Sequence, residues 1–384
     1  MKRKIRIIAE MLLIAFPLCM NAQVKVAKPG QNSYETKEEK TGQERNEPSK
    51  SGLEMPKISG YVQGLYQANL NELGELEDNN TFRMRRVRLS VDGKLWKTVS
   101  YKIQGDFVRS PILVDAYVKY KPCNEFAIQI GQFKTPFTLE SAFNPVNLEI
   151  FDYGEIIQQL SGYSDICGIK STGRDIGVMV TGGFLPMGKN GEKTYNIVDY
   201  AVGLFNGNGI NVVDNNNRKD FVGRIEVHPG VKALTLSGSC YFGQYKTTDD
   251  YGTRNRWSAG AQYNDGKLVV RGEYIDGATG YHNNIAELNG MQIEQFRISN
   301  GYYAVAGYNF QAGKQKIMPV IRYEHFVPGE KDGVVFGETN YYTAGINYWP
   351  LKSVNFKLDY SLIQHIESAK TNSHRVVGIL SYKF

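Results

Sequence analysis

From Met55 onward, segments of about ten residues alternate between apolar and polar or small side chains, with turn residues between them. In the segment KTVSYKIQGDF, Val99, Tyr101 and Ile103 share one face and Ser100 and Lys102 the other. Successive side chains of a strand point to opposite faces, so this segment has one apolar and one polar face. The pattern is typical of a transmembrane β-barrel, whose strands meet lipid on one side and water on the other.

We expect an all-β fold, a transmembrane antiparallel barrel of about sixteen strands, because single-chain bacterial barrels have an even number of strands. A soluble β-sandwich also alternates, so the argument depends on the repetition of the pattern along the chain. The strands are expected near residues 57–69, 82–92, 97–108, 112–121, 125–133, 174–185, 196–206, 219–228, 232–244, 255–264, 267–276, 301–311, 316–326, 340–349, 353–364 and 374–384.

The connections between these strands alternate in length, which is typical of short periplasmic turns and longer extracellular loops. Two connections depart from this rule, the long turn Pro186–Tyr195 and the short loop Arg109–Pro111. The short turns are Gly93–Trp96, Pro122–Glu125, Pro229–Val231, Asp265–Gly266, Ala312–Lys314 and Pro350–Lys352. The longer loops are Leu70–Thr81, Lys134–Gly173, Gly207–Arg218, Tyr245–Arg254, Asp276–Asn300 and Val327–Thr339.

The first residues predict export. A basic start, an apolar stretch and a small residue at Ala22 make residues 1–22 a signal peptide, with the mature chain beginning at Gln23. The apolar stretch is too short for a membrane-spanning helix, which needs about 20 apolar residues. Residues 23–54 are polar and are expected to form a disordered periplasmic leader, or a short helix given their alternating charges. Residues 55–384 form the barrel domain, in the outer membrane of a Gram-negative bacterium.

The amino-acid composition is also typical of a transmembrane barrel with aromatic girdles. The chain has 40 Gly, 25 Tyr and 18 Phe, a bias of strand-rich proteins with many turns and interfacial aromatic side chains. Removing four basic and one acidic residue with the signal peptide leaves 41 − 38 = +3, which is too balanced to indicate nucleic-acid binding. Outer-membrane lipid is the expected surrounding. No spacing of Cys or His indicates a metal site, and no cofactor is expected.

The chain ends in RVVGILSYKF, where Gly378, Leu380, Tyr382 and Phe384 alternate. This pattern is similar to the C-terminal signal by which outer-membrane barrels reach the insertion machinery, with Phe384 as its last aromatic residue. Several strings together resemble the phosphate-selective porin O and P family in its Bacteroidetes form. They are FRMRRVRLSVDGKL (Phe82–Leu95), SYKIQGDF (Ser100–Phe107), DAYVKYKP (Asp115–Pro122), IGQFKTPFTLE (Ile130–Glu140), YAVGLFNGNG (Tyr200–Gly209) and the final strand.

The resemblance spans nearly the whole mature chain and implies a sixteen-stranded barrel, commonly a homotrimer, with a loop folded into the lumen. It implies a passive channel for small anionic or neutral hydrophilic solutes. The family name further implies phosphate or polyphosphate as preferred anions. The lumen residues themselves predict a weak anion preference.

Strand parity predicts which side chains line the pore. In the second strand Val87, Leu89 and Val91 face lipid, so Arg86 and Arg88 face inward. They form either an anion-attracting strip or a strip neutralised by Asp106 and Asp115 on neighbouring strands. The pore-lining residues expected by parity are Arg86, Arg88, Lys102, Asp106, Asp115, Lys119, Arg224, Glu226, Arg271, Glu273, Arg322, Glu324, Lys357 and Asp359. The repeated Arg-x-Glu pairs among them favour wall salt bridges over an ion path.

The long connection Lys134–Gly173 is the expected constriction loop, with an extracellular flap as the alternative. Its carboxylates would face the wall arginines and set up a transverse field. The charged residues expected at the constriction are Lys134, Glu140, Glu149, Asp152, Glu155 and Asp165.

Two other classes of protein are compatible with a β-rich exported chain. A barrel enzyme needs a nucleophile with a base and an acid partner, and none of the five histidines lies in such a motif, so no catalytic residue is expected. The other alternative is a non-channel protein, either an outer-membrane or a secreted β-rich adhesion or binding protein. Conductance across a planar bilayer distinguishes a channel from an adhesin.

Overall fold

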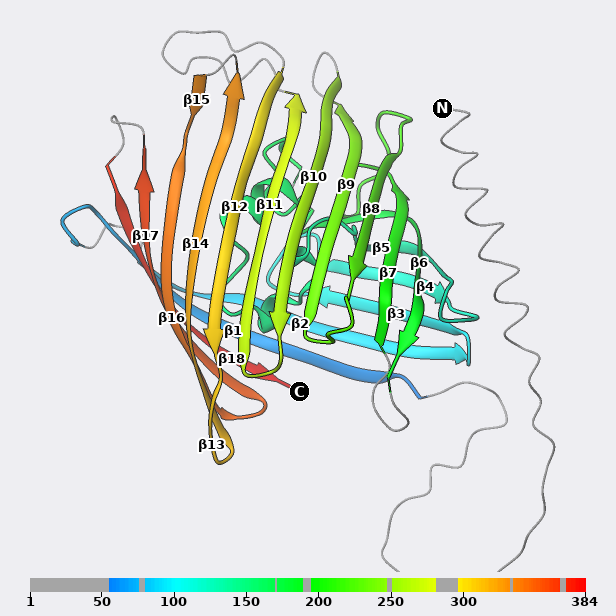
Figure 1. Ribbon diagram of the computed structural model, residues 1–384, viewed down its shortest axis with the longest axis horizontal. Helices are drawn as coiled ribbons and strands as arrows, with labels where there is room; N and C mark the ends of the chain where they lie inside the picture. The colour runs from blue at the N-terminus through cyan, green and yellow to red at the C-terminus, as the bar shows by residue number, and fades with distance from the viewer. Residues whose placement is uncertain are drawn as a thin grey trace, which may run out of the picture.

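The computed structural model describes residues 55–75, 80–169, 171–188, 195–246, 251–280, 296–331, 334–366 and 371–384. They form one closed antiparallel β-barrel with a folded loop inside it (Figure 1). The predicted signal peptide and the whole of the predicted leader lie outside the described residues. Among the residues described, no helix is long and apolar enough to cross a membrane.

Eighteen strand segments make up the sheet. Segment β13 continues β12 along β14, and β15 precedes β16 along the same neighbour, so these two segments add no separate strand and sixteen strands remain. This agrees with the predicted number. The bounds are β1 Lys57–Leu70, β2 Thr81–Trp96, β3 Val99–Asp106, β4 Leu113–Tyr120, β5 Ala127–Lys134, β6 Arg174–Met187, β7 Tyr195–Phe205, β8 Asp220–Val227, β9 Leu234–Lys246, β10 Tyr251–Asn264, β11 Leu268–Gly280, β12 Phe296–Tyr308, β13 Phe310–Ala312, β14 Gln315–Lys331, β15 Val334–Phe336, β16 Thr339–Leu351, β17 Val354–His365 and β18 Ser373–Lys383.

The barrel closes where β1 pairs with β18. Gly60 and Phe384 exchange two backbone hydrogen bonds of 3.0 Å at the end of this seam, and the side chains of Gln63 and Ser381 bond across it at 3.0 Å. The start of β1 and the end of β18 therefore lie together at one edge of the barrel. The tight turns of β10–β11 and β12–β14 lie at the same edge (Figure 1).

Several strands are longer than the sequence predicted at the opposite edge. Strand β11 reaches Gly280, β12 begins at Phe296 and β14 runs to Lys331, so parts of the predicted loops Asp276–Asn300 and Val327–Thr339 are strand. These extensions contain Gly, Pro and charged residues, which disfavour strands in isolation. Pairing with neighbouring strands compensates for this low propensity.

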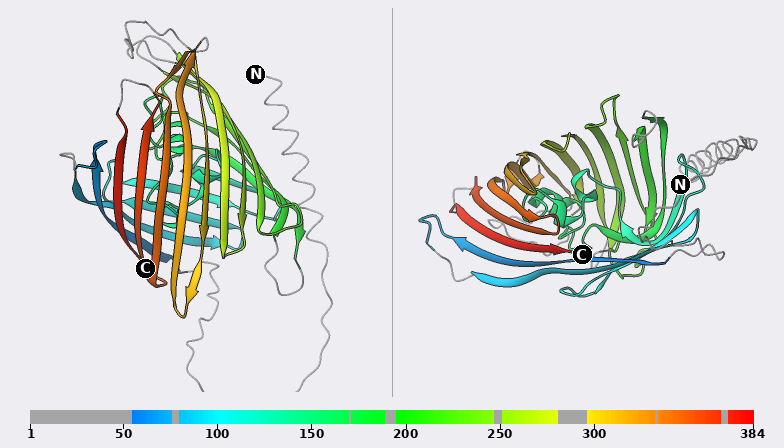
Figure 2. Two further views of the ribbon diagram at one scale, coloured as in Figure 1. Left: turned by 60° about the vertical axis from the view of Figure 1, so that its left-hand side comes forward. Right: turned by 90° about the horizontal axis from the view of Figure 1, so that it is seen from below.

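The two faces follow the predicted parity. On the outside, Ile103 is 52% exposed and Leu358 is 54% exposed, whereas the adjacent Lys357 is 3% exposed on the inside. Gly131 has a φ of +130°, which favours glycine. A Cβ atom at this position would lie 2.2 Å from the carbonyl oxygen of Ala116, so no other residue fits there. Seen from below, the Lys134–Gly173 segment fills part of the ring (Figure 2).

Candidate functional site

The constriction loop, residues 134–173, folds into the lumen as a small packed unit. It contains the 3₁₀ turns η1 (Glu140–Ala142) and η2 (Pro145–Asn147) and the helix α2 (Glu155–Leu160). Its apolar side chains pack against inward-facing apolar side chains of β8, β11, β12 and β14. This core contains Phe137, Leu148, Ile150, Ile156, Ile157 and Leu160 from the loop and Val222, Ile275, Tyr303, Val305, Val320 and Phe326 from the wall. The expected in-folded loop is present, and its apolar side chains fill the part of the lumen beside β8, β11, β12 and β14.

A buried ion cluster joins the loop to β11 and β14. The Glu140 carboxylate is fully buried and lies 3.1 Å from Arg271 and 2.7 Å from Arg322. Arg271 also lies 2.6 Å from Glu149, and Arg322 lies 3.1 Å from Glu324. Each buried guanidinium group thus has two carboxylate partners, and the Glu140 carboxylate is shared between them, which compensates for the removal of these charges from water.

Other wall side chains bind the loop backbone. Glu273 accepts a 2.7 Å hydrogen bond from the Leu139 amide, and Glu324 accepts one of 2.5 Å from the Ile156 amide. Arg256 lies 2.6 Å from Asp165 and also donates to the Leu160 carbonyl. Arg256 was not among the predicted pore-lining residues, although its inward parity in TRNRWS was a usable signal.

Two lysines that were expected to present their charge to the lumen instead donate hydrogen bonds to backbone carbonyls of the loop. Lys134 donates to the carbonyls of Ser141 at 2.7 Å and Phe143 at 2.6 Å, and to the Tyr153 hydroxyl at 3.0 Å. Lys357, on β17, donates to the carbonyls of Leu148 and Ile150. Both ammonium groups therefore hold the loop in place. Asp359 is buried on the same inner face of β17.

The second-strand arginines are paired and almost completely buried. Arg88 lies 3.0 Å from Asp106, which is the pairing predicted for a strip neutralised by neighbouring strands. Arg86 lies 2.8 Å from the loop residue Asp152, which Arg85 also contacts. Of the two alternatives, an anion-attracting strip and a neutralised one, these direct ion pairs match the second, although one partner comes from the loop and not from a neighbouring strand.

The remaining predicted residues fall into three arrangements. Asp115 was expected to neutralise Arg86 or Arg88 but pairs with Arg174 at 2.6 Å, a partner that parity did not indicate. Arg224 and Glu226 pair along one strand at 3.1 Å, as the repeated Arg-x-Glu pattern favoured. Glu155 is only partly buried and accepts a hydrogen bond from Gln159 within α2.

The open part of the lumen lies against β1–β5. Two hollows of about 320 and 250 Å³ share Arg88, Lys102, Gln104 and Asn144, and we call them together the chamber. The first hollow is also lined by Asp115, Tyr117, Gln129, Phe133, Lys134, Ala142, Pro145, Arg174 and Met179. The second is also lined by Ser59, Gly60, Tyr61, Ser90, Val146, Asn147, Lys383 and Phe384.

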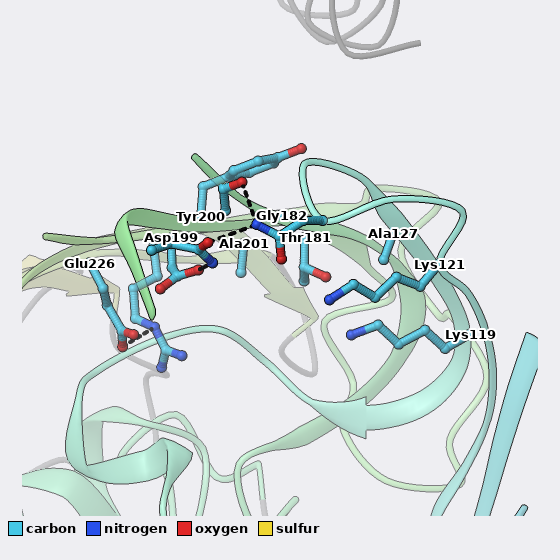
Figure 3. A pocket seen from close by; sticks show the side chains of 13 residues that line it. Lys119, Lys121, Ala127, Thr181, Gly182, Asp199, Tyr200, Ala201 and Glu226 are labelled. Atoms are coloured by element: carbon cyan, nitrogen blue, oxygen red, sulfur yellow. Dashed lines mark hydrogen bonds and ion pairs between the residues drawn. The ribbon is translucent and has the colours of Figure 1, made fainter. Parts of the chain in front are cut away.

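A third hollow of about 240 Å³, the mouth pocket, lies between β4 and β8 (Figure 3). Lys119 and Lys121 extend into it side by side, facing the Arg224–Glu226 pair. A lattice of amides borders it, with Asn124 donating to Asn196 at 2.7 Å and Asn196 to Asp199 at 2.6 Å. Lys119 was predicted to line the pore, whereas Lys121, which shares its parity at the last residue of the predicted strand 112–121, was not among the predicted residues.

The buried loop carboxylates predict acid-resistant closure. Burial raises the pKa of Glu140, but the charges of Arg322 and Arg271 outweigh burial and hold this pKa below the ordinary glutamate value. Burial likewise raises the pKa of Asp165, and Arg256 lowers it below the ordinary aspartate value. A lowered folded-state pKa gives stability that is complete above the unfolded pKa and is lost as pH falls through the folded one. Glu140 and Asp165 should therefore stay ionised from pH 7 to about pH 4.5, and any change in single-channel conductance caused by their protonation should occur only below about pH 4. A conductance transition centred near pH 6 that Glu140→Gln or Asp165→Asn abolishes would contradict this assignment.

No group of three or more His, Cys, Asp or Glu within the described residues is arranged to hold a metal ion. The three hollows of the described lumen are bordered by cations, amides and hydroxyls. Selectivity in such a space comes from its width and its electrostatics.

A family model described as phosphate-selective porin O and P matches residues 57–384. The fold is similar to an anion-selective porin from Comamonas acidovorans, with a TM-score of 0.59, 11% identity and coverage of 86% of this chain and 99% of that one. It is also similar to the outer-membrane channel DcaP of Acinetobacter baumannii, with a TM-score of 0.58, 15% identity and coverage of 88% and 99%. Salmonella typhi OmpF, solved with daunomycin, has a TM-score of 0.57 at 13% identity, covering 87% and 98%. No curated protein sequence matches the chain.

Proposed function

Because the chain belongs to the phosphate-selective porin O and P family and is an outer-membrane porin, we propose that it passes small hydrophilic solutes by diffusion with a weak preference for anions. The observation that carries this preference is the charge of the open lumen. Family and fold favour a channel over an enzyme.

The chamber is lined by more cations than carboxylates. Arg88, Lys102, Lys134 and Arg174 line its larger hollow, with Asp115 as the one carboxylate among the described lining side chains. Lys383 adds a further cation in the smaller hollow. A cleft lined by one sign of charge raises the local concentration of the opposite ion. Most wall arginines are paired, so the preference is weak.

The name of the Comamonas acidovorans porin describes that protein as anion-selective. The same preference in this chain has a local basis in Lys102 and Lys383. Lys102 lies 3.4 Å from a partly exposed Asp92, and Lys383 donates to Asn147. Neither ammonium group is buried against a carboxylate, so both act on ions in the lumen.

Replacing both Lys102 and Lys383 with Gln should shift the reversal potential under a salt gradient toward zero or toward cation preference. The two substitutions remove the least shielded charges of the chamber. In the wild type the preference should weaken with salt, because the Debye length falls from about 10 Å at 0.1 M to about 3 Å at 1 M.

Lys267→Gln is the matched control, since Lys267 is exposed at the turn between β10 and β11 and lines neither hollow. It should leave the reversal potential unchanged. Cation preference in the wild type, or an unchanged preference in the double variant, would refute the assignment.

We further propose a homotrimer that associates through the β3–β5 wall. Outward aromatic side chains are most numerous on β10–β17, as in Trp257, Tyr274 and Tyr342. The outer face of β3–β5 carries Ile103, Val118 and Ile130, with the exposed Tyr120 and the half-buried Tyr101 as its aromatic side chains. Aromatic girdles mark contact with the lipid interface, so this wall, which is poorer in aromatic side chains, suits a protein partner. Light scattering of the purified protein in detergent should give three copies; a single copy would contradict the trimer.

Export completes the proposal. Cleavage after Ala22 would leave the polar residues 23–54 as a periplasmic leader, and Phe384 would present the final strand to the insertion machinery. The intact mass of protein from the outer membrane should correspond to a chain beginning at Gln23. A mass that includes residues 1–22 would refute cleavage there.

A further inference from the structure

The chamber is large for a simple inorganic ion. Its two hollows of about 320 and 250 Å³ meet at Arg88, Lys102, Gln104 and Asn144. Pockets that bind small organic molecules are commonly about 300–1,000 Å³. A phosphate ion, a single tetrahedral group, would fill only a small part of this space.

Neutral hydrogen-bonding groups line much of the chamber. Ser90, Gln104, Gln129 and Asn144 present hydroxyl and amide groups, which both donate and accept hydrogen bonds. Tyr61 lines the smaller hollow, is 4% exposed, and has a hydroxyl without a hydrogen-bond partner among the residues described. Buried polar groups are usually satisfied, so this hydroxyl indicates a bond that a solute or water completes.

The charge of the chamber suits one anionic group. Arg88 is already paired with Asp106, and Arg174 with Asp115. Lys134 is used by the loop. Lys102 lies 3.4 Å from Asp92, but both side chains are partly exposed, so its ammonium group is less neutralised than the buried pairs. It is therefore the cation best placed to bind an oxyanion where the two hollows meet. The chamber thus suits a solute with one anionic group, whose remaining polar groups would contact the amides and hydroxyls of the lining.

Resting on the proposed anion-preferring channel, we infer that the chamber is a binding site for a monosaccharide-sized, polyhydroxylated organic anion bearing one carboxylate or phosphate. Lys102 binds the oxyanion, and Tyr61, Gln104 and Asn144 bind hydroxyl groups. The bound solute crosses the constriction in contact with these residues.

The experiment is single-channel recording of the purified full-length barrel with four probes: galacturonate, glucose 6-phosphate, neutral galactose and inorganic phosphate. Galacturonate or glucose 6-phosphate should reduce the chloride current at lower concentration than either galactose or inorganic phosphate does. The two sugar anions distinguish a carboxylate from a phosphate. Equal block by galactose, or stronger block by inorganic phosphate, would overturn the inference.

Two variants test the residues. Tyr61→Phe removes one hydroxyl that has no structural partner, so folding is retained and the binding constant for the sugar anion should weaken about threefold to tenfold. Lys102→Gln should weaken it at least as much. Tyr382→Phe, on the outer face, is the matched control and should bind as the wild type. Unchanged binding in Tyr61→Phe and Lys102→Gln would overturn the site.

The reversal potential in a chloride gradient separates the two proposals. If the channel shows no anion preference, the proposed function fails. If it prefers chloride over potassium yet the sugar anions neither block the current nor respond to Tyr61→Phe, only the binding site fails.

Discussion

Glu140→Ala should loosen the constriction loop and give a larger, noisier single-channel conductance. The substitution leaves Arg271 and Arg322 buried without the carboxylate that they share. Breaking a buried ion pair costs about 3–5 kcal/mol, and the lower end applies because Glu149 and Glu324 remain as second partners. Proteolysis of the folded barrel should cut the variant within residues 134–173 faster than the wild type.

Glu155→Ala is the control in the same loop. Its carboxylate is only partly buried and accepts one hydrogen bond from Gln159. This variant should keep wild-type conductance and protease resistance. Wild-type behaviour of Glu140→Ala as well would show that the apolar core alone holds the loop, and that the ion cluster contributes little.

Leu358→Arg should hinder membrane insertion by about 2–4 kcal/mol, which is the cost of an arginine near the midplane of the lipid face. Leu358 faces outward from the interior of β17, opposite Ile346 and Gly378 on the neighbouring strands. The measurement is the fraction of protein that folds into lipid vesicles, seen as heat-modifiable migration on gels, together with its unfolding in urea.

The same substitution at Leu351 controls for the introduced charge. Leu351 is 58% exposed at the end of β16, where an arginine reaches the interface and costs about 0–1 kcal/mol. Lys102→Ala, on the inner face, should also insert normally. If Leu358→Arg inserts as well as Leu351→Arg, the outward register of β17 is wrong.

Faces and strand number were predictable because alternation is a local property. The outward position of Ile103 and the inward position of Lys102 follow from strand geometry alone. Partners within one strand, such as Arg224 and Glu226, were also predictable, since side chains two residues apart share a face.

The partners of the remaining charges were not predictable, because they depend on the path of the loop. Arg271 forms ion pairs with Glu140 and Glu149 of the loop, and not with Glu273, which lies two residues away on the same strand. Glu273 is left to accept loop amides. A single sequence places Glu140 in the loop but does not show that the loop crosses the lumen to β11. For the same reason, Lys357 was assigned to the pore lining and Lys134 to the charged residues of the constriction, although both donate to loop carbonyls.

The β1–β18 seam has a consequence for the order of folding. Gln63 and Ser381, which bond across it, are 318 residues apart in the chain, whereas most other strand pairs join neighbours in sequence. The entropy cost of bringing two segments together grows with the length of chain between them, and non-local pairing slows folding. Hairpins from β2 to β17 can form early, while the seam forms last. Until then β1 and β18 present unpaired edges that can join other chains, so the time before closure is the period of greatest risk of aggregation.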